Sequence, residues 1–447
     1  MLESDYGYVG KVIKLSSFIN KYASAVGHTP VTATDPERVV KLQEIGNQLR
    51  QRFGSGCIAE LGVRDINLDR GEPHGLPRAR RHYTILDSIK NPEEAEVLRE
   101  VYQDALCVIG VFAPESVRRK RLKKELTDAY VAKVFEQDQA DGLPFGQNVR
   151  GTMELADFYV RNDGENDVRL RASLARFLEI LFGVGVHTPT KDELAMQAAF
   201  ALASGSACLS RQVGAVVVNE SGDIIGHGRN DVPKFGGGLY TTEDGERDHR
   251  CWKWKSKECH NDACKRRLLD DVEERLASAG VLSPGAEGVK NAVAGAGVKN
   301  LIEFSRSVHA EMDAIISVAR TGNGGIVGST LYTSTFPCHS CARHIVASGI
   351  RRVFYIEPYP KSLALDLHDD SISVDDADEG KKVVFLQFNG VAPRNMLRLF
   401  SQHGERKHGG KVAERMRADA SPVCKAPLDG FETREQLIVA KLKDIGK

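Results

Sequence analysis

Apolar and polar positions along the first 185 residues alternate between the period of a strand and the period of a helix. Apolar runs predict strands at 11–15, 82–85 and 106–112, and helical periodicity predicts helices at 38–52, 92–101 and 114–126. Asn91 followed by Pro92 is typical of a helix start. Because strands and helices alternate, this part is predicted to be a doubly wound α/β domain with a parallel sheet.

The pattern changes after Thr188, where a short linker ends in the helix-start residues Asp192 and Glu193. From there, helices are predicted at 193–203, 309–319 and 341–347, and strands at 212–218, 223–228, 330–335 and 352–356. The sequence Asn-Glu-Ser-Gly at 219–222 predicts a hairpin turn between the first two strands. The last two strands and the helix between them predict a β-α-β unit.

Two short motifs lie at the starts of two of these helices. His309 and Glu311 fall in the first turn of one helix, with Ser307 as its expected N-cap, and Cys338 and Cys341 lie at the start of the other. One imidazole and two thiolates fill three positions of a zinc ion and leave the fourth for water, while a carboxylate that is not a ligand moves protons. The motifs therefore predict a catalytic zinc. The alternative is a core histidine and an incidental or redox pair of cysteines.

Composition narrows the classes of protein and substrate. The 447 residues suffice for two or three domains, and 61 basic residues balance 61 acidic ones, which favours a small-molecule substrate over long nucleic acid. No apolar run approaches the ~18 residues of a membrane span, and Met1–Asp5 lacks the layout of a signal peptide. We therefore expect a cytoplasmic protein without membrane contact, whose nine cysteines are metal ligands and free thiols.

A second cluster of metal-ligand side chains lies between the hairpin and the first motif. Its members are His249, Cys251, Cys259, His260 and Cys264. This density of imidazoles and thiols predicts a second, structural zinc that would order a polar loop. The spacing fits no standard zinc finger, so free cysteines or other packing remain the alternative.

The motif pair H-x-E and P-C-x-x-C, in this order, is identified as that of zinc-dependent nucleobase deaminases. The run 208–218 and the stretch Gly228-Arg229-Asn230-Asp231-Val232-Pro233 are similar to the opening of deoxycytidylate deaminases. In that family the asparagine that matches Asn230 helps to bind the deoxynucleotide; the alternative is a turn residue that tolerates positive φ. Arg211 is a candidate for the substrate phosphates.

Further stretches resemble bacterial antiviral deoxycytidylate deaminases, in which a P-loop nucleoside-monophosphate-kinase-like domain precedes the deaminase domain. The stretches that carry this resemblance are 84–94, 109–115, 156–162, 355–362, 367–372 and 390–394. The resemblance implies a kinase-like domain at 1–185 and a three-layer α/β/α cytidine-deaminase-like domain at 190–402. The deaminase domain would carry an insertion at 231–306, and a charged tail would occupy 403–447.

The expected kinase-like domain departs from its family at the phosphate site. The sequence contains no G-x-x-x-x-G-K-[ST] motif, and Gly7–Val12 has the wrong spacing for one. Either the first strand and P-loop precede this sequence, or its start was chosen too late, or ATP binding has been lost. A basic run at 118–124 is either a solvated helix face or a contact for phosphates or RNA.

The resemblance implies hydrolysis of dCTP, dCMP or both to the deoxyuridine nucleotide and ammonia, with Glu311 as the acid-base and zinc on His309, Cys338 and Cys341. Draining deoxycytidine nucleotides would serve antiviral defence. A homo-oligomer is expected, with a regulatory RNA or phage factor acting through the N-terminal domain. The alternatives are an editing deaminase for RNA or single-stranded DNA, a housekeeping dCMP deaminase that supplies dUMP, and a binding protein without activity.

Overall fold

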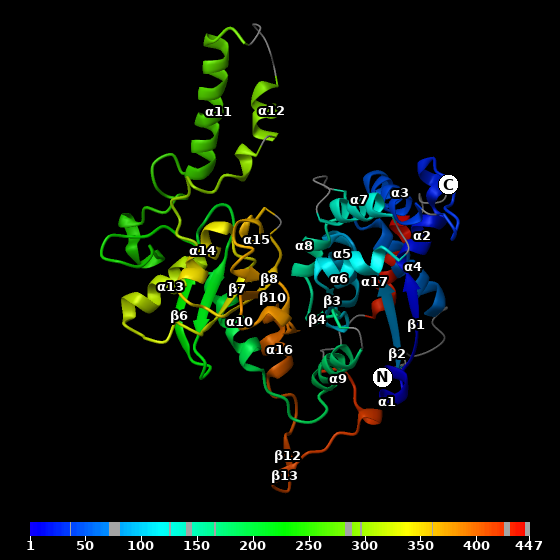
Figure 1. Cartoon of the computed structure of the whole chain (residues 1–447). Helices are drawn as coiled ribbons and strands as arrows, with labels where there is room; N and C mark the ends of the chain where they lie inside the picture. The colour runs from blue at the N-terminus through cyan, green and yellow to red at the C-terminus, as the bar shows by residue number, and fades with distance from the viewer. Residues whose placement is uncertain are drawn as a thin grey trace. The chain divides into compact units, whose positions relative to one another are not determined.

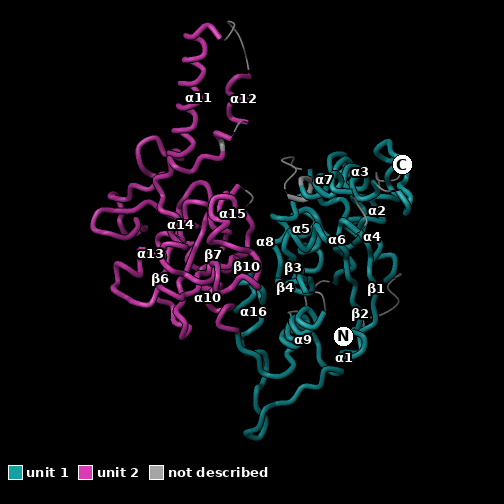
Figure 2. Tube along the Cα trace, in the orientation of Figure 1, with its two compact units in different colours: residues 1–189, 388–447 teal, residues 190–387 magenta. Residues whose placement is uncertain are grey.

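The computed structural model describes residues 1–35, 37–70, 81–124, 127–139, 145–164, 167–281, 288–295, 297–359, 361–423 and 430–442. The chain forms two compact units, one of residues 1–189 with 388–447 and one of residues 190–387 (Figures 1 and 2). The sequence placed the second boundary at 402 and left the tail as a separate segment. The structure instead assigns 388–402, and the described part of the tail, to the first unit.

Backbone pairing explains this difference. Strand β11 (Gly390–Val391) runs antiparallel to β4 (Phe158–Arg161), and β4 runs parallel to β3 (Ile109–Phe112). In the same unit, β1 (Val9–Lys14) and β2 (His82–Asp87) form a separate parallel pair. Among the described residues no strand joins the two small sheets, so the single doubly wound sheet expected from the sequence is not formed there. A further hairpin joins β12 (Lys407–His408) and β13 (Lys411–Val412).

The helices of the first unit begin where the sequence supplies caps. Asn91 accepts a hydrogen bond from the Glu93 backbone and Glu94 closes the capping box, so α5 starts at Pro92 as predicted. The apolar core is built mainly from α2, α3 and α4, with Leu15, Ile45 and Ile58 each 1% exposed. The helices are α1 (Leu2–Tyr6), α2 (Leu15–Lys21), α3 (Arg38–Phe53), α4 (Cys57–Arg70), α5 (Pro92–Tyr102), α6 (Glu115–Leu122), α7 (Asp128–Gln139), α8 (Val149–Glu154), α9 (Val168–Phe182), α16 (Met396–Phe400) and α17 (Phe431–Lys441).

The second unit is built on one six-stranded sheet of order β6-β5-β7-β8-β10-β9. Its strands are β5 (Gly214–Val218), β6 (Ile224–Arg229), β7 (Thr330–Thr335), β8 (Arg352–Glu357), β9 (Ile372–Ser373) and β10 (Val383–Gln387). Strand β5 runs antiparallel to β6 and β7, whereas β7, β8, β10 and β9 are parallel. The predicted β-α-β unit is confirmed, with α14 (His339–Ala347) between β7 and β8.

Helices cover both faces of this sheet, which gives three layers. Helix α10 (Lys191–Ala203) lies against Gly214, where an added Cβ would fall 1.9 Å from the Ala199 carbonyl oxygen. Helix α13 (Ala310–Thr321) lies against the other face at Gly228, where a Cβ would come within 2.3 Å of the Ala310 carbonyl oxygen. Only glycine permits these approaches. The close approach at Gly228 therefore sets the start of α13, which carries the first motif, directly against the sheet.

The insertion between β6 and α13 projects two helices, α11 (His260–Ser278) and α12 (Val289–Gly295) (Figure 1). The short α15 (Ala364–Leu367) follows β8. None of the described helices has both the length and the apolarity needed to cross a bilayer.

Candidate metal centre

The structure brings the two motifs together. His309 Nδ1 lies 3.3 Å from the Sγ atom of Cys338 and 3.3 Å from that of Cys341, and the three ligand atoms lie within 4.8 Å of one another. In the part of the chain that the structure describes, no other group of three or more His, Cys, Asp or Glu side chains converges in this way. The arrangement favours a metal site over the alternative of unrelated core residues.

Two helix starts place these ligands. His309 itself is the N-cap residue of α13, with extended backbone at φ −76° and ψ 153°, so the prediction of Ser307 as the cap is wrong. Cys338 is the N-cap of α14, and its sulfur accepts a hydrogen bond from the Cys341 backbone at 3.4 Å. A helix N-terminus carries partial positive charge, so the N-termini of α13 and α14 both favour the thiolate forms of the two cysteines.

Zinc fits this donor set. A zinc ion with ligands at ~2.0–2.3 Å in tetrahedral geometry would hold nitrogen and sulfur ~3.6 Å apart, close to the separations observed here. Cys338 and Cys341 are buried, which keeps competing water from the two thiolates. His309, Cys338 and Cys341 would hold the ion and leave the fourth position open.

The protonation of the site follows from its burial and its internal hydrogen bonds. Hydrogen bonds from Cys341 and His309 outweigh burial and lower the pKa of Cys338 to about 4, whereas burial raises the pKa of Cys341. Burial also raises the pKa of the Glu311 carboxyl to about 7. A bound dication would favour the thiolate form of both cysteines.

The Glu311 carboxyl lies beside the metal site but does not belong to the group of three converging ligand side chains. Glu311 lies in the first turn of α13, is 4% exposed, and its carboxyl is within hydrogen-bonding reach of Cys341. A carboxyl with a pKa near neutrality both accepts and donates a proton at small energetic cost. The group of three ligands and one adjacent acid can therefore activate water and move its protons.

The two predicted substrate contacts are already engaged within the unit. Asn230 is buried; its side-chain oxygen accepts from the Val213 N–H and its amide nitrogen donates to the Arg211 carbonyl, each at 2.7 Å. Among the described residues only Gln103, Lys255 and Lys257 combine a side chain with positive φ, so the positive-φ alternative for Asn230 is wrong.

Arg211 forms an ion pair with Glu357, and Glu357 also accepts a hydrogen bond from the Thr335 hydroxyl at 3.0 Å. The Arg211 guanidinium lies 5.9 Å from the centre of the Tyr359 ring. Glu357, the last residue of β8, therefore neutralises part of the charge of Arg211.

The five residues of the predicted second zinc do not converge. No three of their ligand atoms lie within 4.8 Å of one another, although all five are described. Cys259 Sγ lies 3.7 Å from Ser210 Oγ, and Cys264 Sγ accepts from Arg267 at 3.0 Å. His249 and His260 instead pack on Trp254, each with ring centres 5.6 Å apart. The geometry favours the alternative of free cysteines and other packing.

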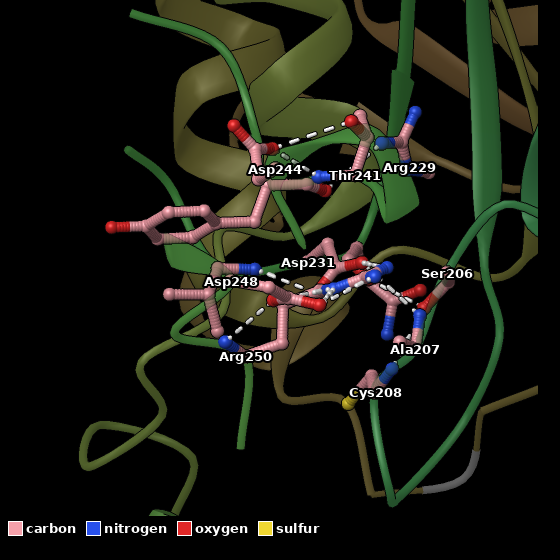
Figure 3. A network of polar contacts seen from close by, with 12 residues as sticks. Ser206, Ala207, Cys208, Arg229, Asp231, Thr241, Asp244, Asp248 and Arg250 are labelled. Atoms are coloured by element: carbon pink, nitrogen blue, oxygen red, sulfur yellow. Dashed lines mark hydrogen bonds and ion pairs between the residues drawn. The ribbon is translucent and has the colours of Figure 1, made fainter. Parts of the chain in front are cut away.

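A buried ionic network next to the site was not found by sequence analysis (Figure 3). Arg250, 5% exposed, binds both carboxylate oxygens of Asp248 at 2.8–3.1 Å and lies 3.5 Å from the Asp231 carboxylate. The Asp231 carbonyl in turn accepts from the Val308 N–H, directly before His309. The network therefore ties the insertion to the segment that carries the first ligand. One arginine in a basic stretch gives no sequence signal of such a role.

Comparison with known proteins agrees with this geometry. Residues 189–357 match the family described as the cytidine and deoxycytidylate deaminase zinc-binding region. The deoxycytidylate deaminase of enterobacteria phage T4 is 30% identical over 178 residues, which are 38% of this chain and 80% of that protein; the enzyme of phage T2 is also 30% identical, over 38% and 82%.

Two weaker similarities complete the comparison. A UPF0200/UPF0201 protein of Archaeoglobus fulgidus is 25% identical over 34% of this chain and 46% of that protein. The crystal structure of dCMP deaminase from the cyanophage S-TIM5 with dCMP and dUMP is 21% identical, over 44% of this chain and 98% of that one, with a TM-score of 0.26. On the strength of the phage relatives and the matched region, this chain belongs to the cytidine and deoxycytidylate deaminase family and is a zinc-dependent deaminase.

Proposed function

We propose that this chain hydrolyses deoxycytidine nucleotides, converting dCTP, dCMP or both into the deoxyuridine nucleotide and ammonia. The observation that carries the proposal is the buried Glu311 carboxyl beside the converged His309, Cys338 and Cys341. Two relatives named deoxycytidylate deaminase, of which this chain covers 80% and 82%, support the deoxynucleotide as substrate.

The side chains have two roles in the proposed reaction: three of them hold the zinc, and one transfers protons. His309, Cys338 and Cys341 hold the zinc, and a bound zinc supplies the acidity that makes water a nucleophile near neutral pH. Glu311 takes one proton from the attacking water and passes it to N3 of cytosine, and it then takes the second proton from the new C4 hydroxyl and passes it to the departing amino group. Water adds at C4, the C4–N bond breaks, and ammonia leaves; one carboxyl suffices because it accepts first and donates afterwards.

Asn230 and Arg211 are the proposed substrate contacts. An asparagine amide offers two donor hydrogens and two acceptor lone pairs, and the contacts of Asn230 with the backbone use one of each. The remaining positions are available to a deoxyribose hydroxyl. Arg211, held by Glu357, is the weaker candidate because an incoming phosphate would compete with that carboxylate.

Product analysis tests the reaction. The zinc-loaded protein is incubated with dCTP, dCMP and CTP, and uracil nucleotides are quantified; absence of product from all three contradicts the proposal. Glu311→Ala should abolish turnover and retain one zinc per chain. If zinc is lost as well, Glu311 belongs to the ligand shell and its proposed role is wrong.

The proposed cellular role is depletion of deoxycytidine nucleotides during viral infection, with control by an RNA or a phage factor through the first unit. Plating phage on cells that express the wild-type chain or Glu311→Ala tests it. Protection by the wild type alone, with a fall in dCTP, is the expected result. Equal plating on both strains contradicts the antiviral role and leaves the reaction itself untouched. Light scattering of the purified chain tests the proposed homo-oligomer.

A further inference from the structure

The insertion carries a short segment, residues 247–257, whose charge differs from that of the whole chain. It contains Arg247, Arg250, Lys253, Lys255 and Lys257 but one acidic residue, Asp248, whereas the chain has net charge zero. Arg250 and Asp248 neutralise each other in the buried network. The exposed charge of the segment is therefore entirely positive. We propose that this segment, together with Arg306, is a binding surface for single-stranded nucleic acid, which goes beyond the deamination proposed above.

Aromatic side chains alternate with these lysines. Trp252 is 45% exposed, between Cys251 and Lys253. Proteins that bind single strands combine cations for the phosphates with exposed aromatic rings on which bases stack. An exposed tryptophan next to a lysine supplies both kinds of contact within a short stretch of chain.

A second tryptophan organises the segment from inside. The Trp254 ring stacks with both His249 and His260, at interplanar angles of 27° and 19°, and the Lys255 and Arg306 cations lie 4.0 Å from its centre. Arg306 also donates a hydrogen bond to the His249 carbonyl at 3.0 Å. These contacts hold the cations on an aromatic face in place of leaving them mobile in water. The surface is therefore ordered before a ligand arrives.

The backbone of the segment is fixed at both ends. Arg250 and Asp248 anchor its start to Asp231 (Figure 3). Near its end, Lys255 and Lys257 adopt φ of 50° and 55°, a conformation that lysine rarely takes. Side chains in such conformations persist where the surrounding structure imposes them, and they concentrate at functional positions. A fixed backbone lowers the entropy lost on binding.

The pattern favours a single strand over other anions. A duplex hides the faces of its bases, so it cannot stack on Trp252, and a mononucleotide cannot reach several lysines at once. Arg306 lies three residues before His309, so a bound strand would contact the segment that leads into the metal site. Regulation of the deaminase by nucleic acid would have a physical route here, distinct from one through the first unit.

Fluorescence anisotropy of the full zinc-loaded chain with a labelled 20-nucleotide oligo-dT tests the proposal. Oligo-dT contains no cytosine or adenine, so deamination plays no part. Trp252→Ala should weaken binding by about tenfold, as expected for the loss of one base stack. Lys253→Glu with Lys255→Glu and Lys257→Glu should reduce the slope of log affinity against log salt by about two, because three phosphate contacts are lost.

The matched control makes the same charge change at three exposed lysines of β1, β12 and β13: Lys14→Glu, Lys407→Glu and Lys411→Glu. It should bind oligo-dT like the wild type. Unfolding midpoint and zinc content establish that each variant is folded. The proposal is overturned if the wild type does not bind at 50 mM salt, if the insertion variants bind like the wild type, or if the control loses affinity. Competition by a duplex or by dTMP at concentrations as low as those of unlabelled oligo-dT would also overturn it.

Discussion

The sheets of the two units differ in how fully their strands are buried. In the deaminase unit every residue of β5 and β7 is buried, because helices cover both faces. In the first unit, Val12 of β1, Ile85 of β2 and Val111 of β3 are 57%, 46% and 56% exposed. Parallel strands are normally covered on both faces, so the strands of the first unit keep exposed apolar side chains that β5 and β7 lack. The metal site lies in the unit whose strands are held from both sides.

The two units also differ in what holds them together. The deaminase unit has a broad apolar core that runs from α13 and α14 onto the sheet. In the part of the first unit that the structure describes, the apolar residues form several smaller clusters, and buried ions occur as well: Arg50 and Glu94, 2% and 0% exposed at the side chain, form an ion pair at 2.8 Å. Asp157, also fully buried, binds Arg99, Arg394 and Asn395. Substitutions should therefore destabilise the two units for different reasons: lost apolar packing in the core of the deaminase unit, and a buried ion left without its partner in the first unit.

The largest effect is expected at the metal site. Cys338→Ser should remove bound zinc and lower the deamination rate by more than about a thousandfold, since the nucleophile depends on the metal. Zinc analysis by mass spectrometry and a dCMP assay measure both. The matched control is Cys251→Ser in the insertion, which should keep zinc and activity. If the control lost one of two zinc ions, the insertion would bind metal after all.

The next largest effect concerns the stability of the first unit. Glu94→Gln leaves the Arg50 guanidinium buried without its carboxylate and also weakens the caps on the Lys90 and Asn91 N–H groups. Removing one partner of a buried pair costs ~3–5 kcal/mol. Hydrogen exchange should show loss of protection in the first unit, with zinc content unchanged. Glu115→Gln, in the exposed pair with Arg119, should cost less than ~0.5 kcal/mol; equal effects would contradict the comparison.

A pH-dependent effect of intermediate size is expected at Asp157. Burial alone would raise its pKa, but Arg99, the Val108 N–H and Asn395 outweigh burial and lower the pKa below its usual value. The ionised group therefore stabilises the fold at pH above the unfolded pKa of ~3.9, and this stabilisation is lost as pH falls through the lower folded pKa. Asp157→Asn should cost ~1.5–3 kcal/mol at pH 7 and much less at pH 2.5. Denaturant titrations at both values measure it; a pH-independent difference would contradict this account.

Local patterns predicted strands β5, β6, β7 and β8 of the deaminase unit and the three converging ligands. The bounds of β7 at 330–335 match those expected, because nearby Gly and Pro residues mark the ends of a strand within a short stretch of sequence. The convergence of His309 with the two cysteines followed from motif order and from the β-α-β unit. The start of α13 was predicted less well, because its N-cap residue is His309 and not Ser307.

Contacts between residues far apart in the chain were not predicted from the sequence. Residues 390–391 pair with β4, more than 200 positions earlier, and Asn395 donates to Asp157 at 2.7 Å, so this stretch belongs to the first unit. No local periodicity encodes such a partner. The insertion illustrates the complementary error: a dense set of cysteines and histidines suggested zinc, but composition does not fix the directions of side chains, and the histidines stack on Trp254.

The smallest effect gives the finest test of the contrast between the sheets. Val217, 0% exposed, packs in the core of the deaminase unit, and Val217→Thr would bury a hydroxyl there at a cost of ~1–3 kcal/mol. Val12, paired with Ile85 in the two-stranded sheet of β1 and β2, is exposed to solvent, so Val12→Thr should change stability by less than ~0.5 kcal/mol. Denaturant midpoints of the two variants compare one substitution in two environments. A large loss at Val12 would mean that another chain or ligand covers this face in solution, because water does not penalise a threonine hydroxyl.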